Sequence, residues 1–233
     1  MTQYTVQWFG HSNFMVATEG FRVLIDPFFD GNPSTKQSWS NISPPDLVLV
    51  THDHGDHVGN AIEICAKYGA KLGCVVGTGK ALIQRGLPKE LLLNGNGFNI
   101  GGPLTVGKAK VTMTQAFHSS DSGVPVGYIV EMPGGLTWYH AGDTGIFSSM
   151  ELFPQLCSID LALLPIGGVY TMCPKQAALA CRLLQCKSVI PMHWGTFPVL
   201  EQNTDTFRKY LANNAPTCHI YDMQPDEMIE IDN

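Results

Sequence analysis

Three histidines and two aspartates occupy six consecutive positions, His52-Asp53-His54-Gly55-Asp56-His57. The segment follows an apolar run typical of a buried strand and precedes residues with helical apolar spacing, so it stands where a strand ends and a helix begins. Side chains alternate along an extended chain, so His52 and His54 point to the same side and can hold one ion together. Asp56 and His57, at the turn into the helix, can hold a second ion beside the first. Imidazole and carboxylate ligands without thiolate suit Zn²⁺, Mn²⁺ or Fe²⁺.

Further ligand types stand alone at the ends of other expected strands. His118, Asp143 and His193 each follow an apolar strand and precede small or turn-forming residues. The carboxyl ends of strands are where α/β folds place their ligand sites. We therefore expect these three side chains to join the cluster at residues 52–57.

Apolar periodicity divides the chain into short strands and helices. The expected strands are Tyr4–Trp8, Phe14–Thr18, Phe21–Ile25, Asp46–Val50, Lys71–Val76, Leu104–Val106, Lys110–Gln115, Gly127–Glu131, Leu136–Tyr139, Asp160–Leu164, Ser188–Pro191, Cys218–Tyr221 and Glu227–Ile231. The expected helices are Val58–Tyr68, Gly79–Arg85, Ser148–Cys157, Pro174–Gln185 and Thr204–Asn213. Residues 27–45 contain four prolines and predict a long loop, of the kind that is functional or acts as a lid. The order of elements predicts two similar α/β halves packed sheet to sheet, with the helices outside.

Composition narrows the class of protein. A length of 233 residues fits one domain over residues 1–233, and no apolar run is long enough for a membrane span. A net charge of −6 argues against a general nucleic-acid binder. The first residues show no signal-peptide pattern, which predicts a cytoplasmic location. Seven scattered cysteines without a Cys-x-x-Cys pair predict small buried thiols, not a disulfide framework or a cysteine-type zinc site.

The candidate ligands also resemble a known family. His52-x-His54-x-Asp56-His57, followed in order by His118, Asp143 and His193, is similar to the pattern of the metallo-β-lactamase superfamily. Further segments resemble the UPF0173 group of small metal-dependent hydrolases. This group is similar to ascorbate-6-phosphate lactonases and, more distantly, to N-acylphosphatidylethanolamine phospholipase D enzymes. The segments are Trp8–Ser12, Asp26-Pro27, Ala116–Ser120, Tyr139–Thr144, Pro165–Gly168, Thr171-Met172 and Pro191–Pro198. The resemblance covers nearly the whole chain. It implies an α/β fold of the αββα sandwich type, in which two mixed sheets pack together with helices outside.

The resemblance also implies a binuclear site with two divalent ions. Carried over by position, one ion would be held by His52, His54 and His118, the other by Asp56, His57 and His193, and Asp143 would bridge them. The group commonly has Tyr-Asn where this chain has Trp194-Gly195, a departure that concerns substrate contacts and not the ligands.

A metal-bound hydroxide would be the nucleophile of such a site, because cations lower the pKa of bound water from 15.7 towards about 7. Its expected substrate is a small ester, lactone or phosphoester. Asp56 is expected to orient or deprotonate the attacking water. His11 either ligates or approaches the metal pair, which would make it a catalytic group, or it bonds the backbone. Candidates for substrate contacts or for support of the ligands are Ser119, His140, Tyr170, Thr171 and Trp194. His54 stands where a diiron oxygen-reducing branch has Glu, which favours hydrolysis over redox chemistry.

Two other functions stay open at this point. One is a metal-dependent phosphodiesterase or nuclease of the same superfamily, although the acidic balance predicts no nucleic-acid partner. The other is a non-catalytic metal-binding protein that keeps the fold. The sequence leaves open the physiological substrate, the native metal and the oligomeric state, a homo-oligomer included.

Overall fold

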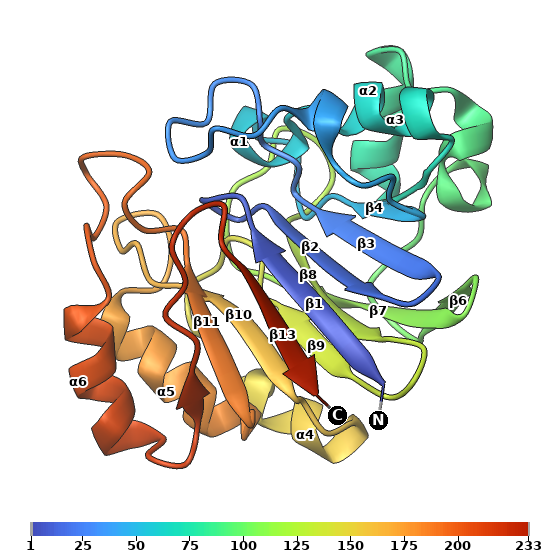
Figure 1. Ribbon diagram of the computed structural model, residues 1–233. Coiled ribbons are helices and arrows are strands. Elements are labelled where there is room, and N and C mark those ends of the chain that lie inside the picture. Colours follow the sequence, from blue (N-terminus) through green and yellow to red (C-terminus); the bar gives the residue numbers. More distant parts are fainter. Residues whose placement is uncertain (1, 233) are drawn as a thin grey trace.

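Two mixed β-sheets packed face to face form the centre of the computed structural model, which describes residues 2–232 (Figure 1). The first sheet runs in the order β13 (Met228–Asp232), β1 (Gln3–Trp8), β2 (Phe14–Thr18), β3 (Phe21–Ile25), β4 (Leu47–Leu49), β5 (Lys71–Gly73). The second runs β12 (His219–Ile220), β11 (Ser188–Met192), β10 (Leu161–Pro165), β9 (Thr137–His140), β8 (Val126–Glu131), β7 (Ala109–Gln115), β6 (Leu104–Val106). Together with the helices described next, this arrangement confirms the α/β sandwich expected from the sequence.

Helices cover the outer side of each sheet. On the first sheet these are α1 (Gly55–Val58), α2 (Ala61–Tyr68) and α3 (Val76–Gln84), and on the second α4 (Phe153–Leu156), α5 (Pro174–Leu184) and α6 (Asp205–Asn214) (Figure 1). Short 3₁₀ turns are η1 (Trp39–Asn41), η2 (Lys89–Leu91), η3 (Leu93–Gly95) and η4 (Ser148–Leu152). Within residues 2–232, no helix has the length and apolar character needed to cross a bilayer.

Each sheet combines an antiparallel part with a parallel part. In the first sheet β1 to β3 pair antiparallel, and β3, β4 and β5 pair parallel. In the second, β6 to β9 pair antiparallel, and β9 to β12 pair parallel. The segment His52–His57, Asp143 and His193 follow the strands β4, β9 and β11 of the parallel parts, whereas His118 follows the antiparallel strand β7. The carboxyl ends of parallel strands meet at one edge of a sheet.

The apolar core holds the two sheets together. Large side chains such as Tyr4 and Trp8 from the first sheet and Trp138 from the second are fully buried in one cluster. Burial of such side chains stabilises the fold by about 25 cal/mol per Å² of apolar surface removed from water. Tyr128 of β8 also donates a hydrogen bond of 2.8 Å to the carbonyl of Val50, at the end of β4. The sheets are thus joined directly beside the segment that begins at Thr51.

The helix expected over Val58–Tyr68 is interrupted. It begins earlier, as α1, and breaks at Gly59, which adopts a positive φ of 42°. A Cβ atom at Gly59 would lie 2.3 Å from the carbonyl oxygen of Pro27, so the close approach of that loop requires glycine here. The expected helix is therefore confirmed over Ala61–Tyr68 and wrong at its start, where Gly59 and Asn60 separate α1 from α2.

Other boundaries differ by a few residues. The strand expected over Lys71–Val76 ends at Gly73, and the helix after it begins at Val76. The two halves are also not separate repeats, because β13 returns to the first sheet and pairs antiparallel with β1. This long-range pairing carries no local signal in the sequence.

Candidate metal centre

The first group of candidate metal ligands consists of three histidines near the end of β4. The Nε2 atom of His52 lies 2.9 Å from the Nδ1 atom of His54, and with His118 their ring nitrogens all lie within 4.8 Å of one another. The Nδ1 atom of His118 is 3.1 Å from the carbonyl oxygen of Tyr170. Since a carbonyl can only accept, Nδ1 carries the proton and Nε2 keeps a lone pair for an ion.

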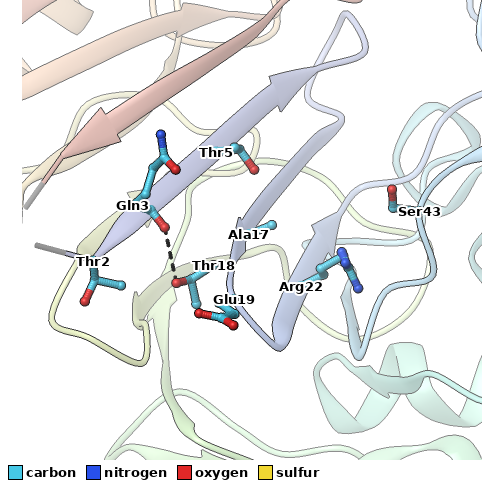
Figure 2. A pocket seen from close by; sticks show the side chains of 8 residues that line it. All are labelled: Thr2, Gln3, Thr5, Ala17, Thr18, Glu19, Arg22 and Ser43. Carbon is cyan, nitrogen blue, oxygen red and sulfur yellow. Dashed lines mark hydrogen bonds between the residues drawn. The ribbon is translucent and has the colours of Figure 1, made fainter.

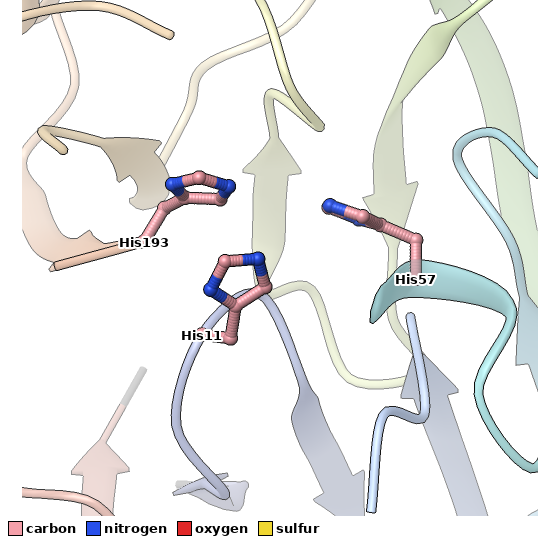
Figure 3. A group of neighbouring side chains, drawn as sticks. All are labelled: His11, His57 and His193. Atoms are coloured by element: carbon pink, nitrogen blue, oxygen red, sulfur yellow. The ribbon is translucent and has the colours of Figure 1, made fainter. Parts of the chain in front are cut away.

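The second group contains three buried histidines from distant parts of the chain. His11 follows β1, His57 lies in α1 and His193 follows β11, and Figure 3 shows their rings around a common space. Their ligand atoms lie within 4.8 Å of one another. The amide of His193 donates to the carbonyl of His11 at 3.1 Å, which fixes the two turns together. The sequence named all three residues but assigned His11 no definite place in this group.

Asp143 lies between the two groups. Its Oδ2 atom is 3.1 Å from Nε2 of His193, 3.4 Å from Nε2 of His57 and 3.6 Å from Nε2 of His118. The carboxylate is almost completely buried, in the loop that follows β9. One oxygen therefore faces histidines of both groups.

Asp56 approaches the second group from the side of solvent. Its Oδ2 atom lies 3.3 Å from Nε2 of His11, and about a third of its side chain is exposed, at 32%. The opposite nitrogen of His11 lies 3.1 Å from the hydroxyl of Thr196. His11 is thus held between a hydroxyl and a carboxylate.

Asp26 is a buried carboxylate whose role the sequence did not predict. It accepts hydrogen bonds from the amide of Thr51 at 2.8 Å and from the hydroxyl of Thr51 at 2.7 Å. It also lies 2.7 Å from Nδ1 of His57, which must donate, so the Nε2 atom of His57 is turned towards Asp143. The available signal was an acid directly after β3, whose neighbour β4 leads into the histidine segment.

Asp53 has a similar organising role on the other side of the site. It accepts hydrogen bonds from the hydroxyls of Ser120 and Ser122 and from the amides of Asp121 and Ser122. Burial opposes ionisation of Asp53, but these hydrogen bonds lower its pKa on balance. The carboxylate thus fixes the loop that carries His118.

Burial and neighbouring charges shift the pKa values of several site residues in different directions. Burial lowers the pKa of His11 to about 4 and that of His52 to about 2. Burial alone would raise the pKa of Asp143, but its contacts with His193 and His57 hold it well below its usual value. His57 differs: burial would lower its pKa, but Asp143 and Asp26 raise it well above 6.5.

The donor set fits a metal ion. Nε2 of His11, Nε2 of His57 and Oδ1 of Asp143 are buried and have no hydrogen-bond partner among the described residues. Buried polar atoms are normally satisfied, so this group of candidate ligand atoms facing one space fits a cation, and a bound cation would require the neutral form of His57. Imidazole and carboxylate are the ligands that Zn²⁺, Mn²⁺ and Fe²⁺ accept.

The family model described as "Beta-lactamase superfamily domain" matches residues 21–194. The chain belongs to the beta-lactamase superfamily. Within this superfamily it is 67% identical over 230 residues to a "UPF0173 metal-dependent hydrolase" of Nitratidesulfovibrio vulgaris, with 99% of this chain and 96% of the relative covered. A protein of the same description from Lawsonia intracellularis is 52% identical, with 97% and 99% covered. The resemblance noted in the sequence is confirmed.

Solved structures of the superfamily have the same architecture. Igni18, a metallo hydrolase from Ignicoccus hospitalis, superimposes with a TM-score of 0.89 at 37% identity, covering 99% of both chains. YhfI, a metallo-beta-lactamase fold protein from Bacillus subtilis, gives a TM-score of 0.75 at 14% identity, covering 99% of this chain and 100% of its own. The second comparison shows the fold alone.

A pocket of about 310 Å³ opens onto the histidines of this beta-lactamase superfamily chain. Its walls are formed by His54, Asp56, His118, Ser119, Asp143, Tyr170, His193 and Phe197. Ser119 and Tyr170, both named from the sequence, lie at this wall, and the hydroxyl of Ser119 is 3.5 Å from Nε2 of His54. Phe197 was not named, because nothing in the sequence places an aromatic residue after the His193 turn at the pocket.

Three other residues named from the sequence lie away from the pocket. His140 is fully buried, accepts from the amide of Gly142 at 3.1 Å and donates to the carbonyl of Ser12 at 3.0 Å. It therefore supports the backbone next to Asp143. Thr171 is buried outside the pocket wall.

The position of Trp194 does not suit substrate contact. Its indole lies 5.4 Å from that of Trp8 and donates to the carbonyl of Pro191 at 3.0 Å, so it is part of the core.

A larger hollow of about 590 Å³ lies elsewhere, over the outer face of β1 and β2 (Figure 2). It is lined by Thr2, Gln3, Thr5, Ala17, Thr18, Glu19, Arg22 and Ser43, which include no histidine or cysteine. The candidate histidine and aspartate ligands thus line the smaller pocket and not this hollow.

Proposed function

We propose that the protein is a binuclear metal-dependent hydrolase acting on a small ester or lactone. The observation that carries the proposal is the position of Asp143, whose Oδ2 atom lies 3.1–3.6 Å from histidines of both groups. A single carboxylate oxygen placed in this way suits two adjacent cations. A site for one cation would not need candidate ligands on both sides of this carboxylate.

The proposed assignment keeps the first group, and in the second group it takes Asp56 as the ligand in place of His11. His52, His54 and His118 hold one cation, Asp56, His57 and His193 hold the other, and Asp143 lies between them. Such cations, when bound, lower the pKa of water and stabilise negative charge that develops on the attacked group. The native metal is proposed to be Zn²⁺, Mn²⁺ or Fe²⁺.

The surrounding residues have positioning and proton-handling roles. Asp26 and Asp53 are positioning residues, since each holds a ligand-bearing segment by several hydrogen bonds. Asp56 is the exposed carboxylate at the pocket wall and is placed to accept a proton from an attacking water. His11 contacts Asp56 and holds that carboxylate in position.

The pocket supports a small, uncharged substrate. Its volume of about 310 Å³ is at the lower end of ligand sites. Among the described residues that line it, none is Lys or Arg, whereas phosphate and nucleic-acid sites rely on such cations. Tyr170 and Phe197 provide aromatic surface at the wall. The ester or lactone is therefore preferred to a phosphodiester or nucleic acid.

The decisive experiment measures metal content and hydrolysis together. The purified chain is stripped with a chelator, reloaded with Zn²⁺, Mn²⁺ or Fe²⁺ and tested on aryl esters, lactones and phosphodiesters. We expect about two ions per chain at the histidine and aspartate ligands, faster turnover of the neutral esters, and a loss of activity of at least ~100-fold in His54→Ala. The matched control is His219→Ala, an exposed histidine outside the site.

Two outcomes would overturn the proposal. If His54→Ala retains as many ions per chain as the parent and the same activity, the metal centre is absent. If metal binds but no substrate class is turned over, the chain is a non-catalytic metal-binding protein.

A further inference from the structure

Three cysteines that are distant in sequence meet at the end of the second sheet. Cys181 lies in the last turns of α5, Cys186 in the link to β11, and Cys218 directly before β12. Their sulfur atoms all lie within 4.8 Å of one another, and all three side chains are buried. We call these residues the cysteine trio.

The cysteine trio is separate from the histidine site. Cys186 precedes the first residue of β11 and His193 follows its last residue, so the two clusters lie at opposite ends of the same strand. At about 3.3 Å per residue this separation is roughly 20 Å. The trio therefore cannot share an ion with the histidines.

Specific local features bring the three thiols together. Gln185 adopts the left-handed conformation, with φ 48°, and turns the chain at the end of α5. The sulfur of Cys186 then lies 3.8 Å from the carbonyl oxygen of Cys181. The amide of His219 donates to the carbonyl of Lys187 at 2.9 Å, and this pairing of β12 with β11 sets Cys218 beside Cys186.

The spacing of the sulfur atoms matches metal coordination. Thiolates bound to Zn²⁺ at about 2.3 Å in a tetrahedral arrangement lie about 3.8 Å from one another. The sulfur atoms of Cys186 and Cys218 are 3.6 Å apart. A disulfide would require about 2.05 Å and would leave the third thiol without a partner. Three converging sulfurs therefore favour an ion.

The trio also has access to solvent and a nearby positive charge. A cavity of about 310 Å³ is lined by all three cysteines and by Arg182 and Asn214. The cavity provides a route for an ion and room for a water as the fourth ligand. Arg182 offsets part of the negative charge that three thiolates would bring to the site.

We propose that Cys181, Cys186 and Cys218 form a second metal site, which takes a thiophilic ion such as Zn²⁺. Soft thiolate ligands select ions of this class. The ion joins the end of α5 to the beginning of β12 and so has a structural role. The structure agrees with the expectation of free and mostly buried thiols, and the proposed site adds a role for three of them. The site does not depend on the proposed hydrolase activity.

The test uses Cd²⁺ as a probe, because a cadmium–thiolate bond gives an ultraviolet charge-transfer band and the histidine site contains no sulfur. The full chain is reduced, stripped with a chelator and titrated with Cd²⁺. We expect a saturable band in the parent and its loss in Cys186→Ser and in Cys218→Ser. Cys65→Ser, a buried cysteine outside the trio, is the matched control and keeps the band. His54→Ala also keeps it, which separates this site from the hydrolase centre.

A second measurement needs no variant. In the native parent, Zn²⁺ is expected to protect three of the seven thiols from a thiol-modifying reagent. Absence of both the band and the protection overturns the proposal. If only five thiols then react in the unfolded chain, the trio holds a disulfide instead, and if all seven react, it holds free thiols.

Discussion

At the scale of single residues, Asp26 shows how the site depends on a buried group that does not line its pocket. Its carboxylate receives three hydrogen bonds from Thr51 and His57 and thereby fixes the ring of a proposed ligand. Partners of this kind fix the tautomer and direction of a metal-binding histidine. The residue was visible in the sequence as Asp26-Pro27, but its target lies 31 residues away and depends on the pairing of β3 with β4.

Asp26→Asn is therefore expected to weaken metal binding. An amide keeps the shape of the carboxylate but loses its charge and one acceptor, so the affinity for Zn²⁺ should fall about 10–100-fold. The measurement is competition with a chromophoric chelator. Asp30→Asn is the control, because Asp30 is exposed and bonds Asn60 instead. Equal affinity in both variants would contradict the role of Asp26.

His57 predicts a pH dependence for the metal-free protein. Although burial lowers its pKa, Asp143 and Asp26 raise it well above 6.5 in the folded state. A raised histidine pKa stabilises the fold fully below the unfolded-state value, and this contribution is lost as pH rises through the folded-state pKa. In the presence of chelator, the Tm of the parent should therefore fall above about pH 6.5.

The same series with His57→Gln tests the cause. This variant should lose the alkaline fall in Tm, while His219→Gln, with an exposed histidine, should keep it. Parallel curves for the parent and His57→Gln across this range would show that His57 is not the titrating group.

At the scale of elements, the sequence predicted what local physics determines. The strands Phe14–Thr18 and Phe21–Ile25 agree with the structure residue for residue, because residue types that favour strands and the Glu19-Gly20 turn are local signals. The break at Gly59 was not predicted, because its reason is the approach of Pro27 from a separate segment.

The loop over residues 27–45 was also correctly expected. Whether it is a lid could not be read from the sequence, and the structure shows it tied down. Asn32 donates to the carbonyls of Phe9 and Phe28, and Asp226 accepts from Thr35 and Lys36.

Gly167 connects the loop after β10 to the site. A Cβ atom there would lie 2.2 Å from the carbonyl oxygen of His193 and 3.0 Å from its Nδ1 atom. Gly167→Ala should displace His193, lower the bound metal by about one ion per chain and destabilise the fold by ~1–3 kcal/mol. Gly145→Ala is the matched control, since a Cβ atom there meets nothing within 4 Å. Metal analysis and denaturant unfolding of both variants measure these two effects. Full metal content in Gly167→Ala would refute the proposed link between Gly167 and the position of His193.

At the scale of the whole molecule, the site lies where the two sheets meet. His52, His54 and His57 belong to the half that carries the first sheet, whereas Asp143 and His193 follow strands of the second. The sequence predicted this set because each residue stands at a strand end, which is a local feature, and the resemblance to a known family assigned the residues to two ions. It did not predict the place of His11 or the cysteine trio, because both depend on which distant strands and turns become neighbours.

Metal binding should therefore stabilise the molecule as a unit. An ion that binds only the folded state contributes about 4 kcal/mol at a thousand times its Kd. For a chain of this length each kcal/mol raises Tm by about 2–4 °C, so each site filled to that extent should raise Tm by ~8–16 °C. Calorimetry with Zn²⁺ against chelator measures the gain. His54→Ala should lose most of the gain that comes from the histidine site, and His219→Gln should retain it.

Because the ligands join both sheets, the parent should still unfold in a single transition. Separate transitions for the two halves would show that the ions do not couple them.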